Sequence, residues 1–266
     1  MHLLSPWTTR PPRRATQPGH GRRAFITGLA SLPVAAGAAT DKAQPPAPRL
    51  TILFCGDSLA QGLYLTLLPL LRRRDAMRSV NGTQHATGIT RFDEHNWPEV
   101  VRGHVARNQP DLVVFWIGAN DFRPLVWREQ RIRFDFGTEG FAEHYRQRVS
   151  GMVAAATEAG GRAMWLGLPN MREARMASAA RTLNELQSGA AEGAGALPVA
   201  TWKATSDPQG RYLAAIEGAR GTRPMRAEDG VHFTDYGYRR VAKVAFDAAA
   251  ERFPEFAGDL AGIGEA

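Results

Sequence analysis

The sequence feature that most constrains the fold is a short apolar run that recurs along the chain, separated each time by a longer segment of helical pattern. The clearest examples are "LTILFCG" at 50–56, "PDLVVFWIG" at 110–118 and "RAMWLGLP" at 162–169. Weaker versions occupy 77–83 and 197–202. A strand that is apolar at nearly every position is typical of a parallel sheet covered on both faces, so these runs predict the strands of such a sheet.

Helical patterns fill the intervals between the apolar runs, at 59–74, 98–108, 141–159, 173–192 and 236–252. Each can place an apolar stripe on a sheet, as Tyr145, Val149 and Met152 do in the third segment. The alternation predicts an α/β fold: a three-layer α/β/α sandwich with a doubly wound, mainly parallel sheet. We expect one domain over 49–257 and a flexible tail at 258–266.

The N-terminal residues have the layout of an export signal. Residues 1–38 hold five arginines and no acidic residue, and the Arg22-Arg23 pair precedes a weakly apolar run at 24–39. The pair resembles a twin-arginine signal. We therefore expect 1–38 to be a signal peptide that directs the protein to the periplasm or out of the cell, and 39–48 to be a Pro-rich linker. A retained membrane anchor is the weaker interpretation, since the run is short and contains Gly and Pro.

Charge, cysteine content and histidine spacing argue against three kinds of site. The chain has 33 basic and 26 acidic residues, and because the leader holds five of the basic ones, the remainder is nearly balanced and indicates no nucleic-acid partner. Cys55 is the one cysteine, so it cannot form an intrachain disulfide and is expected to be a buried apolar side chain. A metal site is not expected, since no recognised ligand spacing relates His85, Asp93, Glu94 and His95.

Polar residues follow the predicted strands, where doubly wound folds form their ligand sites. Ser58 follows the first apolar run and Asn120 the third, while Asp229 and His232 precede the last helical segment. Taken alone, Ser58 is explained as a helix N-cap, and the D-x-x-H spacing by chance. Taken together, the predicted fold can bring all four side chains to one place.

The order serine, aspartate, histidine predicts a hydrolytic triad. In a D-x-x-H turn the carboxylate of Asp229 can reach the near ring nitrogen of His232 and fix its tautomer. The far nitrogen then stays free to take a proton from the hydroxyl of Ser58. No G-x-S-x-G elbow surrounds this serine, which separates the chain from the α/β-hydrolases.

The chain resembles the SGNH hydrolases, the GDSL esterase family, over residues 49 to 253. The four sequence blocks of that family are matched, in order, by Gly56-Asp57-Ser58-Leu59, Gly88, Gly118-x-Asn120-Asp121 and Asp229-x-x-His232. Further stretches, "TGITRFDEHNWP", "WLGLPNMRE" and "DGVHFTDYGYRRVA", are similar to an exported bacterial branch whose physiological substrates are mostly unassigned. The resemblance implies the flavodoxin-like SGNH hydrolase fold.

The resemblance also implies a role for each matched residue. In this family the serine attacks an ester carbonyl and the histidine acts as general base and then general acid, so Ser58 and His232 take these roles, and Asp229 orients the imidazole. The oxyanion donors are then the backbone N–H groups of Ser58 and Gly88 and the side-chain amide of Asn120. No metal, nucleotide or other cofactor takes part in this chemistry.

Four further residues are expected to support the site or to touch substrate. Asp57 and Asp121 are expected to hold their loops rather than to act as acids. Trp97 and Arg123 are expected to meet substrate, because loops on a rigid scaffold often carry binding residues. The segment 123–140 fits two interpretations, a solvated hairpin or a substrate-side flap that meets a sugar or an anionic group.

These expectations combine into an exported serine hydrolase that acts on carboxylic esters. Given the predicted export, we expect the substrate to be an acyl ester, foremost an O-acetyl group on a cell-envelope polysaccharide. Two alternatives stay open: an O-acyltransferase that uses the same residues to acylate a glycan, and a non-catalytic glycan-binding or assembly protein on the same fold. We expect a monomer with no nucleic-acid partner and no membrane span after processing.

Overall fold

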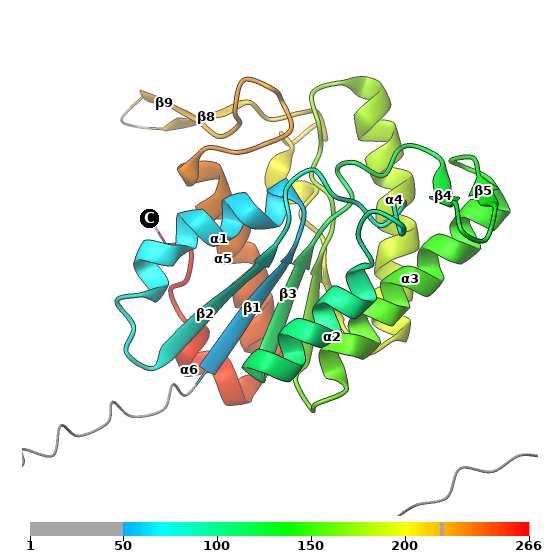
Figure 1. Cartoon of the computed structure of the whole chain (residues 1–266). Helices are drawn as coiled ribbons and strands as arrows, with labels where there is room; N and C mark the ends of the chain where they lie inside the picture. Colours follow the sequence, from blue (N-terminus) through cyan, green and yellow to red (C-terminus); the bar gives the residue numbers. More distant parts are fainter. Residues whose placement is uncertain (1–49, 219–220, 266) are drawn as a thin grey trace, which may run out of the picture. The chain divides into compact units, whose positions relative to one another are not determined.

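The computed structural model describes residues 50–218 and 221–265, which form a parallel sheet between two layers of helices (Figure 1). The predicted signal peptide and linker, 1–38 and 39–48, lie outside the described residues. The sheet consists of β1 (Leu50–Gly56), β2 (Met77–Thr83), β3 (Leu112–Trp116), β6 (Arg162–Leu166) and β7 (Leu197–Val199). The predicted three-layer α/β fold with a doubly wound parallel sheet is confirmed.

The strand order is β2-β1-β3-β6-β7, and every neighbouring pair is parallel. The chain moves outward from β1 to β2, returns past β1 to β3, and then continues to the other edge. The direction of winding therefore reverses between β1 and β3. In doubly wound sheets, ligands bind in the crevice at the carboxyl ends of such a strand pair, so topology alone places a site at the ends of β1 and β3.

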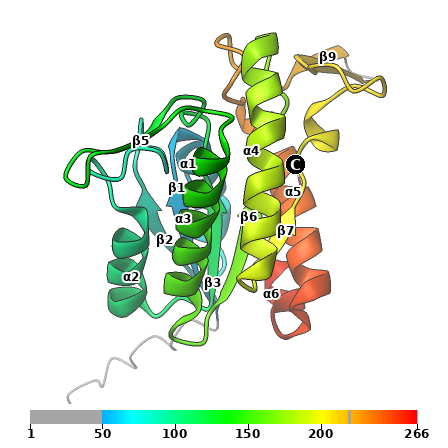
Figure 2. The ribbon, with the colours of Figure 1, turned by 90° about the vertical axis from the view of Figure 1, so that its right-hand side faces the viewer.

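Helices cover both faces of the sheet. The long ones are α1 (Ser58–Leu71), α2 (Trp97–Asn108), α3 (Glu139–Thr157), α4 (Ala174–Gly193) and α5 (Asp235–Arg252). Helix α1 packs with α5, while α2 packs with α3 and α3 with α4; Figure 2 shows α2 and α5 on opposite sides of the strands. In the described part of the chain, no helix has the length and apolar character needed to cross a membrane.

Aromatic residues fill the core on both sides of the sheet. Phe54 of β1 packs against Tyr64 of α1 and Phe246 of α5, with ring centroids 5.6 and 6.5 Å apart. On the other face, Phe115 of β3 stacks on Trp165 of β6 at 5.1 Å. Because successive strand residues point to opposite faces, a strand covered on both sides has to be apolar throughout. This is why β1 and β3 are unbroken apolar runs.

Two antiparallel hairpins extend from the ends of the sheet. The first, β4 (Leu125–Trp127) with β5 (Ile132–Phe134), lies within 123–140, where a hairpin is one of the two interpretations. The second, β8 (Ala215–Gly218) with β9 (Gly221–Pro224), precedes α5 and has no counterpart among the sequence predictions. The hairpins lie on opposite sides of the carboxyl edge of the sheet in both views (Figures 1 and 2).

The C-terminal residues correct the predicted domain boundary. After α5 the chain forms a 3-10 turn (Pro254–Phe256) and the short helix α6 (Ala257–Leu260). Leu260 and Ile263 are each 1% exposed and belong to the core. The expected flexible tail at 258–266 is therefore wrong for the described residues, which pack against the domain. Leu260 and Ile263 stand among glycines and lack the regular helical spacing of apolar residues that would have predicted their burial.

We expect Leu260→Ala to lower the free energy of unfolding by about 2–5 kcal/mol, because it removes a buried side chain and leaves a cavity. Leu65→Ala is the matched control: Leu65 is 56% exposed on α1, and its truncation is expected to change stability by less than about 0.5 kcal/mol. Urea unfolding followed by circular dichroism measures both. Equal effects of the two substitutions would contradict the packing of the C-terminal segment.

Candidate active site

Ser58 lies at the carboxyl edge of the sheet, where β1 gives way to α1. β1 ends at Gly56, Asp57 is the N-cap of α1 and Ser58 is its first residue. Gly56 has a φ of +142°, and a side chain there would overlap the backbone carbonyl of Trp116 on β3. Only glycine permits this turn, which leaves the Ser58 side chain partly exposed at the edge of the sheet.

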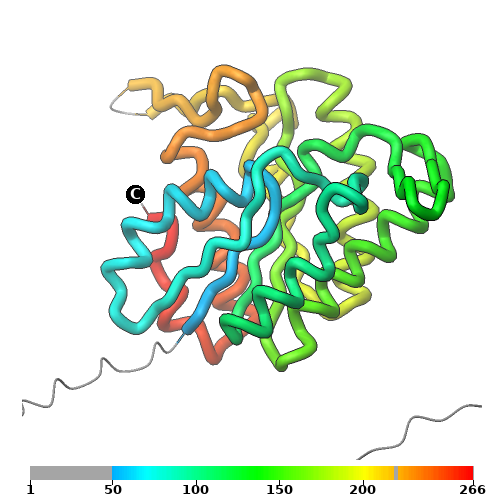
Figure 3. The backbone as a smooth tube through the Cα atoms, in the orientation of Figure 1, coloured from blue at the N-terminus to red at the C-terminus, as the bar shows by residue number. Residues whose placement is uncertain are grey.

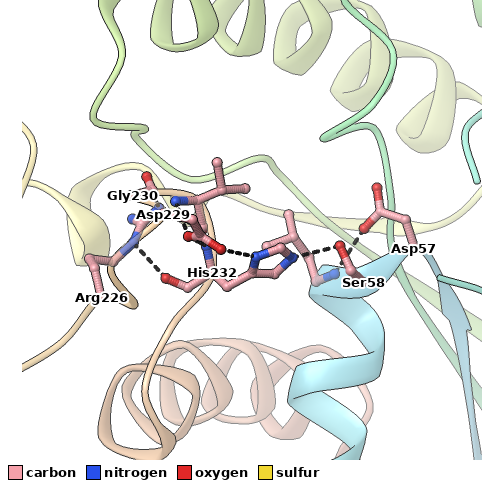
Figure 4. Close-up of polar contacts among 8 residues, drawn as sticks. Asp57, Ser58, Arg226, Asp229, Gly230 and His232 are labelled. Carbon is pink, nitrogen blue, oxygen red and sulfur yellow. Dashed lines mark hydrogen bonds and ion pairs between the residues drawn. The ribbon is translucent and has the colours of Figure 1, made fainter. Parts of the chain in front are cut away.

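Three side chains form a continuous chain of hydrogen bonds at this edge (Figure 4). His232 Nε2 lies 2.7 Å from Ser58 Oγ, and His232 Nδ1 lies 2.6 Å from Asp229 Oδ2. Because the carboxylate accepts the proton on Nδ1, Nε2 faces the hydroxyl as an acceptor. The fold thus brings together the predicted Ser58, Asp229 and His232, although the serine and the histidine are 174 residues apart in the chain.

The carboxylate of Asp229 is fixed by its own turn. Its Oδ1 accepts hydrogen bonds from the backbone N–H groups of Val231 at 2.8 Å and His232 at 2.9 Å. Partial burial acts to raise the pKa of this carboxyl, but the hydrogen bonds from the His232 side chain and from the two N–H groups lower it to about 2. The group therefore stays ionised at neutral pH and holds the imidazole by charge as well as by geometry.

Arg226 holds the same turn and has no counterpart among the residues that the sequence predicts. It is 6% exposed, and burial lowers its pKa to about 10, so it remains charged at neutral pH. Its guanidinium stacks on the ring of Phe233 at 4.0 Å. It donates, at 2.7 to 3.3 Å, to the backbone carbonyls of Asn170, Gly230, Val231 and His232. Figure 4 shows Arg226 beside Gly230 and His232. Every residue has such a carbonyl, so no sequence signal marks these partners.

Asp57 is buried beneath the start of α1 and ties the ends of β1 and β3 together. Its Oδ1 accepts from the N–H of Leu59 at 2.9 Å, which caps α1, and its Oδ2 accepts from Gly118 and Ala119 at 2.9 and 3.0 Å. Burial raises the pKa of this carboxyl to about 6, against the lowering effect of the three N–H groups. Asp57 thereby fixes the loop that carries Asn120.

Gly88 and Asn120 lie on two loops that Asp121 joins. The Asp121 carboxylate accepts from the N–H and the hydroxyl of Thr90, at 3.1 and 2.9 Å. Gly88 packs so closely on Asp121 Oδ1 that a methyl group there would overlap it. Asn120 Nδ2 donates to the Thr87 carbonyl at 2.9 Å, which uses one N–H of the amide and leaves the second for another acceptor.

Tyr145 and Gln187 extend this network beneath the site. The Tyr145 hydroxyl donates to Asp121 Oδ2 at 3.0 Å, and Gln187 Nε2 donates to Tyr145 and to the carbonyl of Ile117, both at 2.9 Å. Burial raises the pKa of the Tyr145 hydroxyl, so it keeps the proton that it donates. The apolar stripe on α3 predicts the burial of Tyr145 but gives no sign of its hydroxyl partner.

The remaining predicted residues lie in different settings. Trp97 is 1% exposed at the start of α2, with its ring 4.5 Å from that of His95, so the expected contact with substrate is wrong. Arg123 is half-buried and lines a cavity beside β4. Cys55 is buried, and burial raises the pKa of its thiol. Within the described ranges, no group of three or more His, Cys, Asp or Glu residues is placed to hold a metal ion.

This arrangement has the parts that acyl chemistry on a serine requires. A hydroxyl faces an imidazole nitrogen able to accept its proton, and an ionised carboxylate stabilises the imidazolium that results. The Ser58 N–H lies at a helix N-terminus, where the helix dipole favours negative charge. The N–H groups of Ser58 and Gly88 donate to no acceptor in the part of the chain that the structure describes, so neither is engaged in another hydrogen bond.

The sequence matches the model of one protein family. Residues 51–248, which include every residue of the site, match the family described as protein of unknown function (DUF459). The chain belongs to this family. A search of curated proteins finds no match to the sequence.

Several solved structures similar to this DUF459 protein are named as esterases or lipases. A catalytic mutant of Axe2, an acetylxylan esterase from Geobacillus stearothermophilus, is 17% identical with a TM-score of 0.52, covering 77% of this chain and 96% of that one. A GDSL-like lipase from Bacteroides thetaiotaomicron is 15% identical with a TM-score of 0.51 and coverage of 77% and 89%. The acetyl xylan esterase AlAXEase is 17% identical with a TM-score of 0.51 and coverage of 74% and 98%. The predicted SGNH hydrolase fold is confirmed.

Gly88→Ala is expected to lower the free energy of unfolding of this DUF459 protein by about 1–3 kcal/mol, since the added methyl group overlaps Asp121 Oδ1 and displaces the loop. Gly189→Ala on α4 is the control, because its methyl group would meet open space, and it is expected to raise stability by about 0.5–1 kcal/mol. Urea unfolding measures both. A Gly88→Ala protein as stable as the wild type would contradict the close packing of this loop on Asp121.

Proposed function

We propose that this DUF459 protein is an esterase that hydrolyses an acyl ester through a covalent acyl-enzyme. The observation that carries the proposal is the 2.7 Å contact between Ser58 Oγ and His232 Nε2, with Asp229 on the other ring nitrogen. A serine hydroxyl is a weak nucleophile unless a base takes its proton, and here a base is in place and oriented. The helix cap is a different residue, Asp57, so capping does not account for the serine.

In the proposed reaction, Ser58 Oγ attacks the ester carbonyl carbon while His232 Nε2 takes the hydroxyl proton. The carbonyl π electrons move to oxygen and give a tetrahedral oxyanion. Collapse of this intermediate breaks the bond to the alcohol, which leaves with the proton returned by His232, and the acyl group stays on Ser58. A water molecule, activated by the same imidazole, then hydrolyses the acyl-enzyme and restores the serine.

The proposed donors to the oxyanion are the N–H groups of Ser58 and Gly88 and the amide of Asn120. Donors that are fixed before the reaction need no reorganisation as charge develops, and one amide donor contributes about 2.7–4 kcal/mol. The Thr87 carbonyl fixes the Asn120 amide, and Asp121 fixes the loop that follows Gly88. These contacts support the assignment of both positions.

The exposure of the site favours a bulky substrate. The His232 and Asp229 side chains are 30% and 50% exposed, so an acyl group carried on a polymer can reach Ser58 without entering a deep pocket. The same exposure admits water to the acyl-enzyme. This favours hydrolysis over transfer of the acyl group to a second alcohol.

The proposed substrate is an O-acetyl ester on a cell-envelope polysaccharide. Axe2 and AlAXEase, which share the fold, are named as acetylxylan esterases, and Axe2 has catalytic mutants at one serine and one aspartate. The Arg22-Arg23 leader, which lies outside the described residues, predicts export to the compartment that holds such polysaccharides. Fold and leader together support an acetylated glycan of the envelope.

The proposal predicts that a fluorophosphonate probe labels the purified protein at Ser58. Ser58→Ala is expected to abolish labelling and to lower kcat on p-nitrophenyl acetate and on acetylated glycans at least about a thousandfold, because it removes the hydroxyl that His232 contacts. Ser178→Ala, at an exposed serine on α4, is the control and keeps both properties. Intact-mass spectrometry measures labelling, and acetate release measures turnover. Full activity in Ser58→Ala would overturn the proposal.

The same reaction mixtures separate the proposed esterase from its alternatives. Acetate release equal to the ester consumed supports hydrolysis. Acetyl transfer to an added glycan, without acetate release, supports an acyltransferase instead. Binding of acetylated glycan with neither labelling nor turnover supports a non-catalytic protein.

Arg226→Lys is expected to lower kcat about ten- to a hundredfold while the protein stays folded, since lysine keeps the charge but cannot donate to four carbonyls at once. The turn that carries Asp229 and His232 then loosens. Arg240→Lys, which loses one surface hydrogen bond to the Ala204 carbonyl, is the control. Equal kcat values of Arg226→Lys and the wild type would contradict the positioning role.

A further inference from the structure

A cavity of about 350 Å³ lies between the loop that follows β2 and the β4–β5 hairpin. This is the volume of a small-molecule site. The course of the two segments can be followed in Figure 3. A β-bridge between Arg91 and Val126 joins them. Charged residues, four basic and two acidic, dominate the lining: Arg91, Arg123, Arg128, Arg133, Asp93 and Glu94.

The acidic groups of this cavity are already engaged. Glu94 accepts from Arg91 at 2.7 Å and lies 3.9 Å from the Arg128 guanidinium, and Asp93 accepts from the backbone N–H of Arg128. Arg123 is a half-buried residue and differs from these, because its guanidinium has no acidic partner in the described ranges. A charge partly removed from water is stabilised by an opposite charge beside it. The cavity therefore offers an uncompensated positive group.

Both walls of the cavity continue into the proposed oxyanion donors. Thr90 is two residues after Gly88, and Arg123 is three residues after Asn120. Since successive Cα atoms are about 3.8 Å apart, the Cα atoms of Arg123 and Asn120 lie within about 11 Å of each other. Asp121 accepts from the Thr90 N–H and so fixes one wall against the other. The donors and the cavity walls therefore lie on the same two segments of the chain.

None of the residues that line the cavity is aromatic, so the lining offers no ring on which a neutral sugar could stack. The Trp127 ring packs on Phe92, with centroids 4.7 Å apart, and the Arg148 guanidinium lies 5.8 Å from the Trp127 centroid. Both rings are half-buried and pack on each other outside the cavity lining. Recognition in the cavity therefore depends on charge and hydrogen bonds.

We propose that this cavity binds an anionic group, a carboxylate or a phosphate, on the alcohol part of the substrate, with Arg123 as its ion-pair partner. The inference rests on the proposed function and narrows the substrate to an acyl ester of an acidic saccharide. An acetyl group is too short to extend from the oxyanion donors into the cavity, so the anionic group belongs to the alcohol. The planar guanidinium can donate two parallel hydrogen bonds to a carboxylate or phosphate.

Steady-state kinetics on three acetylated oligosaccharides of equal length test the inference: a neutral xylo-oligosaccharide, an oligogalacturonate and a phosphorylated oligosaccharide. The wild type is expected to have a lower KM for an acidic substrate, and the two acidic substrates show which anion is preferred. Arg123→Gln is expected to raise that KM about tenfold with kcat unchanged, because the ion pair is present in both the bound and the transition state. The KM for the neutral substrate stays the same.

Arg131→Gln is the matched control, since it removes the same charge from an exposed position of the same hairpin outside the cavity lining. It is expected to change the KM for the acidic substrate less than about twofold. Equal KM values of the wild type for all three substrates, or equal effects of the two substitutions, would overturn the inference while ester hydrolysis stands. If no ester is hydrolysed, the proposed function fails, and calorimetric binding of oligogalacturonate and of the phosphorylated oligosaccharide to wild type and Arg123→Gln decides the anion site: tighter binding to the wild type supports it, and equal binding overturns it.

Discussion

The buried carboxylate of Asp57 is the interaction on which the candidate site depends. It accepts from three backbone N–H groups, one on α1 and two on the loop after β3, and so joins the two strands between which the winding of the sheet reverses. Without it each of these N–H groups would be buried unpaired, at about 1–3 kcal/mol each. Ser58 follows Asp57 directly and Asn120 follows Ala119, so one side chain positions both a hydroxyl and an amide.

The central sheet could be predicted because strands buried on both faces are marked by composition alone. β1 and β2 begin and end at the predicted residues, 50–56 and 77–83. The predicted first residues of the helices are less accurate. The apolar pattern of a helix begins at its first core residue, which can lie after the residue at which the helix begins. The structure begins α3 and α5 earlier than the apolar pattern does, because the hydroxyls of Thr138 and Thr234 accept backbone N–H groups there.

The residues that meet at the site carry recognisable motifs, whereas the residues that hold them do not. Arg226 binds main-chain carbonyls, and Tyr145 reaches Asp121 from a different helix, so neither contact leaves a spacing in the sequence. Trp97 is the opposite case, a residue for which the sequence suggested a role that the structure contradicts. Its place in a loop suggested contact with substrate, but a loop position does not give the direction of a side chain, and this ring turns into the core.

The hairpins β4–β5 and β8–β9 have a consequence for how such a protein can diversify. Each is held by its own antiparallel ladder, and neither adds a strand to the central sheet. Substitutions in either hairpin can therefore change the surface at the carboxyl edge of the sheet while the strand pairing of the scaffold stays the same. The hairpins and the central sheet can thus vary independently of each other along the chain.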